Sequence, residues 1–514
     1  MKFLCVAFLA ALMTVGAEAV AQDVTLTSRD GDVEISGNLL GYDGEFYRVD
    51  TIYGELTVDG SGVLCDGPGC PNLEDFVAEA RFSGAPTVGR VLMPALIEAF
   101  ALRNGMELRR DAAGDDRLIY VLSDRETGQT RGRFIFRLTN SDEGFADLLA
   151  NEADIVMSIR EVREDEMRRA QDAGLGDLSD GRRSLVLALD ALVPIVAADN
   201  PVVGISIRNL VKVLTGKIDN WSGLGGVDAP IDLHLHDPQS GLGQVMQKHL
   251  LRGEDTAQAE LHADPAELGR SVAKNPFAIG VTSRSISGLA RALALEGACG
   301  FSVRATRWSI KTEDYPLTAP VFLYLPARRF PKLVREFLAF SRNRSAQLVI
   351  RRAGYVDQQP EEIAISAQGE RFANAILRAG DEVTLKDLKT MVQTLAPLQR
   401  LTTTFRFEPG SARPDAQSRA NIGRLARALE TGEYDERRLV FAGFSDGEGP
   451  AQANRRIARR RADTVRKAVI DATETADLSR VDLETAGFGE AMPMACDDSD
   501  WGRSANRRVE IWVR

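Results

Sequence analysis

The chain has 514 residues, of which 44% are hydrophobic, so it can bury the cores of several domains. Its formal net charge of −11 argues against general affinity for nucleic acid, because polyanions attract proteins with a surplus of Lys and Arg. After the N-terminus, no stretch is long and apolar enough to predict a membrane-spanning helix.

Residues 1–21 have the pattern of a secretory signal peptide. Lys2 supplies a minimal positive end, Phe3 to Val15 is an apolar run, and Ala19-Val20-Ala21 forms a small-residue cleavage site. The alternative is an uncleaved anchor, although the run is shorter than a membrane span. The pattern predicts a mature chain that lies outside the cytoplasm.

Of the five cysteines, one lies inside this N-terminal segment and four remain in the mature chain. Cys65 and Cys70 occur in CDGPGC, around a Pro-Gly turn, and no further zinc ligands lie near them. In an oxidising compartment we expect them to close a small disulfide loop. Cys299 and Cys496 are far apart in sequence, which leaves open whether they pair across domains or remain free thiols.

Residues 22–72 predict a small all-β unit. Four short segments with alternating polarity (TLTS, DVEISGNLLGYD, EFYRVDT and GELTVD) are separated by Asp-Gly and Tyr-Gly turns. This pattern is typical of a β-meander. The unit shows no catalytic chemistry, so we expect a docking module or a cap on the next domain.

Residues 76–357 alternate between helical and strand-like patterns. A helix is predicted at Val91 to Leu102, and strand-like runs recur at 118–122, 153–159, 192–198, 278–283 and 321–326. The alternation predicts an α/β domain with a mainly parallel sheet. Its length suits two α/β lobes with a cleft between them.

Several segments of this region resemble the PstS-like phosphate-binding branch of the periplasmic solute-binding proteins. The most specific is ISIRNLVKVLTGKIDNWSGLGG at Ile205 to Gly226, and others are SGAPTVG at Ser83 to Gly89 and AGYVD at Ala353 to Asp357. The resemblance implies a two-lobed binding-protein fold that takes a small anion such as phosphate. It also implies a partner, either an ABC-type permease or another envelope protein.

The candidate anion-binding residues stand mainly at predicted helix starts, where free backbone N–H groups and the helix dipole favour an oxyanion. His236 is included as a cleft-lining residue, because it stands where the family has an arginine. The candidates are Ser83, Thr87, Ser141, His236, Ser240 and Gly241.

Three departures from the family pattern keep the ligand open. Leu242 stands where the family has a hydroxyl residue, and Asp142 and Glu143 are expected to repel phosphate. A different small anion or polar ligand, or a scaffold that binds no solute, therefore remain alternatives.

Two histidines alternate in DLHLHD, which places His234 and His236 on one face of a strand. Together with Asp237 they could bind a metal ion, but their spacing fixes no third ligand beyond this run. We therefore assign neither a metal nor a cofactor.

Residues 358–398 form a connecting segment with a polar break followed by two helix-like stretches, at 362–379 and 384–398. Their moderate periodicity predicts a helical linker that packs on a neighbouring domain rather than a flexible tether.

The stretch from Gly443 to Val469 follows a predicted strand and reads mostly as a helix. At about 100° per residue, an apolar arc forms, and Arg461 lies in its middle, close to the direction of Asn454. The arc comprises Ile457, Ala458, Ala462, Val465, Ala468 and Val469. An inward arginine is costly unless an anion meets it, so Asp446 and Arg461 could share a ligand pocket or form an internal salt bridge.

This stretch resembles the OmpA-like peptidoglycan-binding domain. The motif positions are Gly443, Ser445, Asp446, Asn454, Ile457, Ala458, Arg461, Ala462 and Val465. GFGE at Gly487 to Glu490 and NRRVEI at Asn506 to Ile511 extend the resemblance over residues 399–514.

The resemblance implies an α/β sandwich that binds the diaminopimelate of the peptidoglycan stem peptide. Asp446 is expected to pair with the ligand's ammonium, and Arg461 to grip its carboxylate in a two-bond fork. Asn454 and Ser445 complete the expected peptidoglycan-binding set. The sequence shows no nucleophile with an adjacent base, so we expect no enzymatic activity.

The sequence thus predicts a periplasmic, peptidoglycan-associated envelope protein, at or near the outer membrane, with a solute-binding domain for uptake or sensing. The alternative is a structural scaffold whose middle domain binds a protein partner. The expected domains are a signal peptide at 1–21, a β unit at 22–72, a solute-binding domain at 76–357, a linker at 358–398 and an OmpA-like domain at 399–514.

Overall fold

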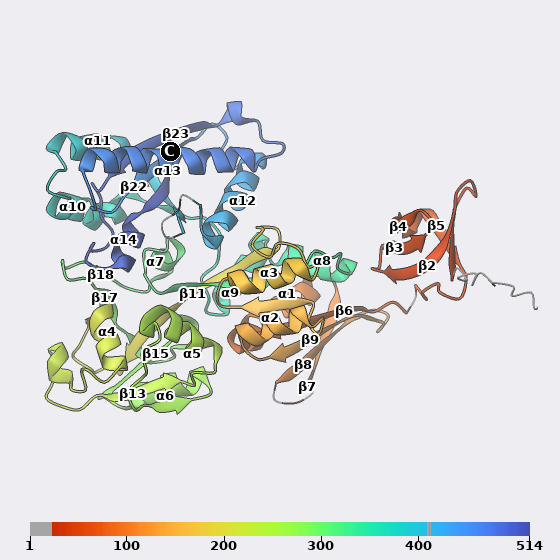
Figure 1. The fold of residues 1–514 in the computed structure, drawn as a ribbon, viewed down its shortest axis with the longest axis horizontal. Helices are drawn as coiled ribbons and strands as arrows, with labels where there is room; N and C mark the ends of the chain where they lie inside the picture. Colours follow the sequence, from red (N-terminus) through yellow and green to blue (C-terminus); the bar gives the residue numbers. More distant parts are fainter. Residues whose placement is uncertain (1–22, 74, 113, 115, 409–410, 412) are drawn as a thin grey trace, which may run out of the picture. The chain divides into compact units, whose positions relative to one another are not determined.

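The computed structural model describes residues 23–514 except 74, 113, 115, 409–410 and 412 (Figure 1). The predicted signal peptide lies outside the described residues. The chain divides into two compact units, one containing the chain up to Ala78 with Arg329–Arg335, and the other Glu79–Arg328 with Glu336–Arg514. Among the described helices, none has the length and apolar character needed to cross a membrane.

The first unit contains a five-stranded antiparallel sheet with the order β4-β3-β2-β1-β5, which confirms the predicted all-β unit. Alternate side chains form its small core, with Val24, Leu26, Tyr47 and Val49 buried. A disulfide joins Cys65 and Cys70. The strands are β1 Val24–Ser28, β2 Glu34–Tyr42, β3 Phe46–Thr51, β4 Gly54–Asp59 and β5 Val63–Asp66.

The second unit contains an 11-stranded sheet with the order β14-β13-β15-β11-β19-β10-β6-β9-β8-β7, and β16 pairs with β11. Its strands are β6 Ala78–Gly84, β7 Met106–Ala112, β8 Arg117–Asp124, β9 Thr130–Leu138, β10 Ile155–Ser158, β11 Ser184–Val196, β13 Asp232–His236, β14 Glu260–His262, β15 Ala278–Ser283, β16 Arg291–Ala292 and β19 Thr318–Tyr324. A smaller sheet contains β12 Gly204–Ser206, β17 Ala294–Glu296 and β18 Ser302–Val303.

Helices of this region lie in two lobes, one drawn in orange, yellow and teal and the other in yellow-green and green (Figure 1). They are α1 Met93–Arg103, α2 Ser141–Leu149, α3 Glu164–Asp172, α4 Ile207–Leu214, α5 Gly241–Met246, α6 Pro265–Lys274, α7 Arg307–Lys311, α8 Lys332–Phe340 and α9 Arg344–Arg352. All residues of β11 are buried, and this strand pairs with β19 and with β15, which connects the lobes.

The expectation of a mainly parallel sheet is wrong. β11 runs antiparallel to both β15 and β19, and β7, β8 and β9 form an antiparallel meander. The connections between β7, β8 and β9 are too short for the crossover that parallel neighbours need. Parallel pairing is retained where a helix lies between the strands, as between β6 and β10.

The C-terminal part contains a five-stranded sheet with the order β20-β21-β24-β22-β23 and helices on both faces. Leu439 and Phe441 of β22 face one core, whereas Val440 and Ala442 face the other, because successive strand side chains alternate. The strands are β20 Glu362–Ile363, β21 Gln399–Arg406, β22 Arg438–Phe444, β23 Asp482–Gly489 and β24 Arg508–Val513.

The helices of the C-terminal part are α10 Gly369–Arg378, α11 Leu385–Leu395, α12 Ala416–Glu430, α13 Ala451–Asp471 and α14 Asp500–Asn506. α12 and α13 cover one face of the sheet, and α10 and α11 cover the other. The two helices of the expected linker therefore form a layer of the C-terminal sheet, with Met391 and Leu395 fully buried against it.

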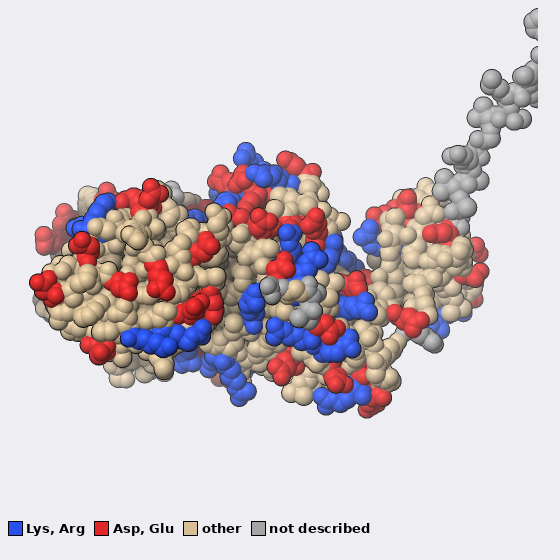
Figure 2. Space-filling model, turned by 90° about the horizontal axis from the view of Figure 1, so that it is seen from below, with Lys and Arg blue, Asp and Glu red and all other residues tan. Residues whose placement is uncertain are grey.

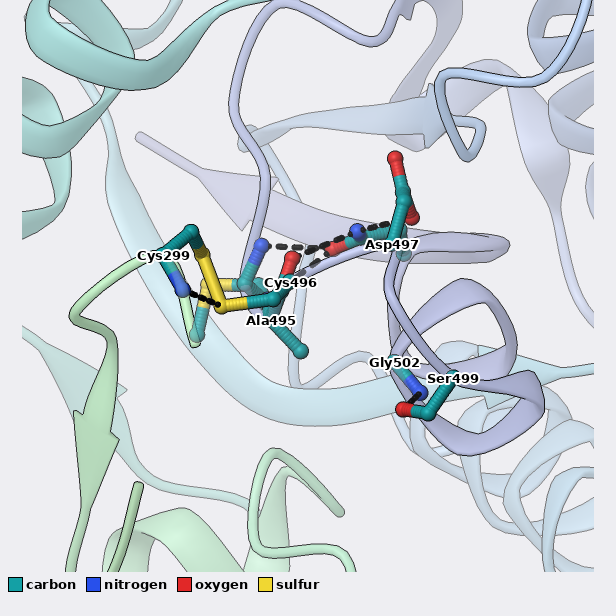
Figure 3. The surroundings of a disulfide bond; sticks show 8 residues. Cys299, Ala495, Cys496, Asp497, Ser499 and Gly502 are labelled. Atoms are coloured by element: carbon teal, nitrogen blue, oxygen red, sulfur yellow. Dashed lines mark hydrogen bonds between the residues drawn. A yellow bond between two sulfur atoms is a disulfide. The ribbon is translucent and has the colours of Figure 1, made fainter. Parts of the chain in front are cut away.

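A disulfide and buried ion pairs join the two parts of the second unit. Cys299, between β17 and β18, is bonded to Cys496, which lies 197 residues later in the chain before α14 (Figure 3). Arg400 of β21 donates to Asp314, with 2.7 Å between Nη1 and Oδ2, and both side chains are buried. The cysteine pairing that the sequence left open is thus a covalent link within one compact unit.

Candidate functional site

The predicted peptidoglycan-binding residues lie where α13 crosses the ends of β22 and β23. Ser445 and Asp446 directly follow β22, and the backbone N–H of Ser445 donates to the carbonyl of Gly489 at 2.9 Å. Asn454 and Arg461 are seven residues apart on α13, which places both on the same side of this helix. The strand ends and one helix face thus bring the four residues into one region.

The carboxylate of Asp446 pairs with Arg507 rather than with Arg461. Its Oδ2 lies 2.6 Å from Nη1 of Arg507, which comes just before β24. Among the described residues, Arg461 forms no ion pair within 4.0 Å. The alternative of a direct Asp446–Arg461 salt bridge is therefore wrong for this structure.

The guanidinium of Arg461 is half-buried and lies 5.5 Å from the centroid of the Phe407 ring. Burial lowers the pKa of Arg461, Asp446 acts in the opposite direction, and Arg507 adds to the lowering. A half-buried guanidinium without a carboxylate partner is costly, so an incoming anion would relieve this cost.

Acidic side chains other than Asp446 also lie in this region. Burial raises the pKa of Glu490, and the charges of Glu382, Asp497 and Asp446 raise it further, which shows that the carboxylates lie close enough to repel one another. The hydrogen bond from Asn454 lowers the pKa of Glu490. The region therefore contains several carboxylates as well as the guanidinium groups of Arg461 and Arg507.

Two polar groups at this junction have different environments. The amide nitrogen Nδ2 of Asn454 donates to the carbonyl of Gly449 at 3.2 Å. The hydroxyl of Ser445 is buried, and it finds no hydrogen-bond partner in the part of the chain that the structure describes. Because a buried hydroxyl normally has a partner, Ser445 is suited to contact a ligand atom.

The structure corrects one residue of the predicted apolar arc and adds one functional candidate. Ile457 is 41% exposed, because it lies outside the buried stripe of α13, which includes Ala458, Ala462 and the valines. Arg507 was not singled out from the sequence. The sequence feature that could have identified Arg507 is its position in the NRRVEI segment, directly after Asn506, which is fully buried in the structure.

In the middle domain, the space between the lobes is small and largely apolar. A cavity of about 20 Å³ is lined by Thr87, Asp190, Ser283 and Tyr355, together with Ile159, Ala191, Leu192, Leu242, Val245, Ala319 and Val321. The hydroxyl of Tyr355 donates to the carbonyl of Thr87 at 2.9 Å. A cavity of this size holds about one water molecule.

Most hydroxyls of the predicted anion site are engaged by the protein itself. Ser83 donates to Asp147 with 2.5 Å between the oxygens. The hydroxyl of Ser141 accepts from the backbone N–H of Ile159 at 3.3 Å, and that of Ser240 accepts from the N–H of Gly243 at 3.1 Å.

The remaining candidates differ in position. His236 is buried with Nε2 3.1 Å from the hydroxyl of Thr282. Gly241 lies so close to Ile159 that an added Cβ would stand 3.4 Å from that side chain. Thr87 lines the small cavity directly. Ser141 and Gly241 do not line it, but both lie next to Ile159, which does.

The expected repulsion by Asp142 is offset in the structure. Its Oδ2 accepts from Arg163 at 3.2 Å, and its Oδ1 pairs with the buried Arg160. Burial raises the pKa of Asp142, but the two arginines outweigh this effect and leave the pKa below its usual value. The charge of Asp142 is therefore already compensated within the protein.

A second carboxyl group, Asp190, lines the cavity itself. It accepts hydrogen bonds from Ser283 and from Ser285, the latter with 2.7 Å between the oxygens. Burial raises the pKa of Asp190, while the two serines act in the opposite direction.

Two family models match the chain. The model described as a PBP superfamily domain matches residues 83–344, and the model described as the OmpA family matches residues 406–507. The first match covers more than half of the chain, so the protein belongs to the PBP superfamily. More particularly, it fuses a PstS-type domain of this superfamily to an OmpA-family domain.

Relatives of each part show partial similarity. Over 187 residues the chain is 28% identical to the phosphate-binding protein PstS of Bacillus subtilis, which is 35% of this chain and 60% of that protein. Over 157 residues it is 27% identical to the probable lipoprotein YiaD of Escherichia coli, which is 30% of this chain and 62% of that protein. The chain thus spans about 60% of the length of these curated relatives.

Among solved structures, an ABC-type phosphate transport receptor from Vibrio cholerae aligns with a TM-score of 0.42 at 23% identity. The alignment covers 54% of this chain and 99% of that chain.

Proposed function

We propose that this protein is a periplasmic envelope protein that is anchored to peptidoglycan through its OmpA-family domain. The observation that carries the proposal is the half-buried guanidinium of Arg461, which lies beside Asp446 but forms no ion pair among the described residues. A ligand carboxylate would supply the missing partner in two parallel hydrogen bonds.

The opposite charges of the region suit a ligand that carries both signs, such as the diaminopimelate of the stem peptide. Arg461 would bind its carboxylate, and Asp446 would bind its ammonium with support from the neighbouring acidic groups Glu490 and Asp497. Asn454 and Ser445 would hydrogen-bond to the same ligand. The proposal involves no covalent step, so wall hydrolysis by the purified protein would contradict it.

Sedimentation with diaminopimelate-type peptidoglycan tests the anchor. We expect the mature protein to sediment with the polymer, and Asp446→Ala and Arg461→Ala each to lose about 2–5 kcal/mol of binding free energy, because each substitution leaves one charge without its partner. Arg456→Ala is the matched control, since Arg456 is an exposed arginine on the same helix.

Circular dichroism would establish that the variants fold. Failure of the wild-type protein to sediment would refute the anchor, and unchanged binding by Arg461→Ala would refute the role assigned to this residue.

For the PstS-type domain we propose capture of a small anion, such as phosphate, for uptake or sensing. The starts of α2 and α5 both lie beside Ile159, and helix starts favour oxyanions. The cavity in this conformation is too small for such a ligand, so binding would require the lobes to open. An ABC-type permease or another envelope protein would then receive the solute or the signal.

A specific observation favours a second function, that of a scaffold for a protein partner. Leu242, Ile159 and Val245 line the interlobe cavity, which leaves little polar surface for a solute. On the face drawn in Figure 2, basic side chains lie among acidic and uncharged ones rather than in one continuous basic surface. We therefore propose a protein partner rather than a nucleic acid for this second function.

Thermal unfolding distinguishes the two functions of the middle domain. Solute capture predicts that phosphate or another small anion raises the melting temperature, because a ligand that binds only the folded state stabilises it. The scaffold predicts no response across a panel of phosphate, other inorganic anions and small carboxylates. Sodium chloride at matched ionic strength is the control.

A further inference from the structure

Three side chains with metal-binding atoms meet at the edge of the 11-stranded sheet. His234 lies on β13, and Glu260 and His262 lie on the edge strand β14. The two strands are parallel, with His234 opposite Glu260 and His236 opposite His262. Because residues two apart on a strand share a face, all four side chains project to the same side of the sheet.

The distances between the polar atoms are short. Nδ1 of His234 lies 2.9 Å from Nε2 of His262. Oε2 of Glu260 lies 3.7 Å from Nδ1 of His234, and its Oε1 lies 3.5 Å from Nε2 of His262. One ligand atom from each of the three residues thus lies within 4.8 Å of the other two, so all three can face one common position.

The geometry matches a small tetrahedral metal site. Metal–ligand bonds of about 2.0–2.1 Å separate neighbouring ligand atoms by about 3.3 Å in a tetrahedron, which lies within the observed spread. Both imidazoles are 3% exposed, and Glu260 is exposed. Two buried histidines with a carboxylate at the solvent side leave a fourth position for water.

A further carboxylate orients one of the histidines. Oδ2 of Asp232 lies 3.3 Å from Nε2 of His234 and also accepts a hydrogen bond from Asn275 at 2.7 Å. A proton on Nε2 makes Nδ1 the hydrogen-bond acceptor from Nε2 of His262 in this structure, and a metal ion at the common position would replace the shared proton. Carboxylate–histidine–metal arrangements of this kind fix the tautomer of a ligating imidazole.

We propose that His234, Glu260 and His262 bind one divalent transition-metal ion of the zinc class. The DLHLHD pattern indicates His234, His236 and Asp237 as candidate metal ligands. In the structure, however, the imidazole of His236 contacts Thr282. The partner of His234 comes from the neighbouring strand, which no spacing within DLHLHD reveals. The metal would stabilise the position of β14, a three-residue strand at the edge of the sheet that pairs with β13.

Calorimetric titration with Zn²⁺ tests the site on the full mature chain, after treatment with a chelator and removal of any affinity tag. We expect one Zn²⁺ per chain and a higher melting temperature, with weak or no response to Mg²⁺ and Ca²⁺, which prefer oxygen ligands. Co²⁺ should give the visible spectrum of a tetrahedral site.

Variants separate the proposed ligands from their surroundings. Glu260→Gln, at an exposed position, should weaken Zn²⁺ binding at least about tenfold, and Asp232→Asn should weaken it about 10- to 100-fold by releasing His234. His262→Gln should abolish the Co²⁺ spectrum. Glu267→Gln, at an exposed position of α6, is the matched control and should bind like the wild type.

Circular dichroism of the metal-free variants would show that they fold. Absence of stoichiometric binding by the wild type, or equal binding by folded Glu260→Gln, would overturn the proposal.

Discussion

At the residue scale, the decisive finding is how charges are paired. Asp446 has an internal partner in Arg507, which holds its carboxylate beside Arg461 without consuming the Arg461 guanidinium. The internal pair fixes the position of the Asp446 carboxylate, and the Arg461 guanidinium has no carboxylate within 4.0 Å among the described residues. This arrangement explains how a buried acidic residue and a half-buried arginine can stand close together without cancelling each other.

A carboxylate of the second unit permits a residue-scale prediction. Glu313 stands in left-handed backbone conformation, with φ of 54°, and its buried Oε2 has no hydrogen-bond partner among the described residues. Burial raises the pKa of Glu313 well above its usual value, the charge of Asp415 adds to this, and Arg406 opposes it.

Glu313→Gln should therefore raise the free energy of unfolding at pH 7 by about 1–3 kcal/mol, because glutamine avoids the free-energy cost of desolvating or protonating this carboxylate on folding. Since the folded state raises the pKa, the native glutamate contributes stability at acidic pH that is lost as pH rises through the folded-state pKa. The gain from the substitution should shrink toward about pH 4.

Urea unfolding at pH 7 and pH 4 measures this difference. Glu98→Gln, at an exposed position of α1, is the control and should change stability little at either pH. A lower free energy of unfolding for Glu313→Gln at pH 7 would contradict the prediction. It would show that interactions within the folded protein stabilise the native carboxylate.

At the element scale, the position of α13 depends on glycines in two neighbouring strands. Gly443 of β22 and Gly487 of β23 are register partners in the sheet. A Cβ at Gly443 would stand 2.0 Å from the carbonyl oxygen of Ala458, and one at Gly487 would stand 2.6 Å from the backbone nitrogen of Arg459. The two glycines therefore let the helix backbone lie directly on the sheet, which brings Arg461 toward the strand ends.

Substitution of either glycine should displace α13. Gly443→Ala and Gly487→Ala should each lower the free energy of unfolding by about 1–3 kcal/mol, because the added methyl group meets backbone atoms that cannot rotate away. Displacement of the helix should also weaken sedimentation with peptidoglycan.

The control is Gly423→Ala in the middle of α12, where an added Cβ would meet one flexible arginine atom at 3.6 Å. This change should stabilise the protein by up to about 1 kcal/mol, because alanine favours a helix over glycine. If all three variants unfold like the wild type in urea, close packing at Gly443 and Gly487 does not determine the stability of this layer.

The fold class followed from the sequence because hydrophobic periodicity records which local segments become strands and helices. The strands of residues 22–72 and the run that became β11 are examples. The direction of pairing did not follow, because β11 meets β15 and β19 through contacts far apart in the chain. Likewise, the periodicity of residues 358–398 predicted the two linker helices, but it did not predict which face of which sheet they cover.

At the scale of the whole molecule, the binding-protein part and the OmpA-family part are held together covalently and electrostatically. The Cys299–Cys496 disulfide acts beside the buried Asp314–Arg400 ion pair (Figure 3). If the C-terminal part binds the wall, these links would fix the binding domain to it without a flexible tether.

Loss of the long-range disulfide should reduce the stability of the second unit. The paired substitutions Cys299→Ser and Cys496→Ser should lower its free energy of unfolding by about 2–5 kcal/mol, because the bond closes a loop of 197 residues. Differential scanning calorimetry under non-reducing conditions measures the change.

Cys65→Ser with Cys70→Ser is the matched control. This pair removes a disulfide of the first unit and should leave the unfolding transition of the second unit unchanged. An unaltered transition in the Cys299 and Cys496 variant would mean that the buried ion pairs and apolar contacts suffice to hold the two parts together.

The sequence by itself determined the classes of domain and the residues that we propose for the C-terminal site, because local periodicity and short motifs are features of the linear order. Asp446, Asn454 and Arg461 follow from one strand–helix motif. Only the tertiary structure decided that Arg507 is the partner of Asp446, that Glu260 and His262 join His234, and that Leu242 lines the small interlobe cavity. These contacts depend on strand order and on the packing of side chains from distant segments, and neither is encoded in the spacing of a single segment.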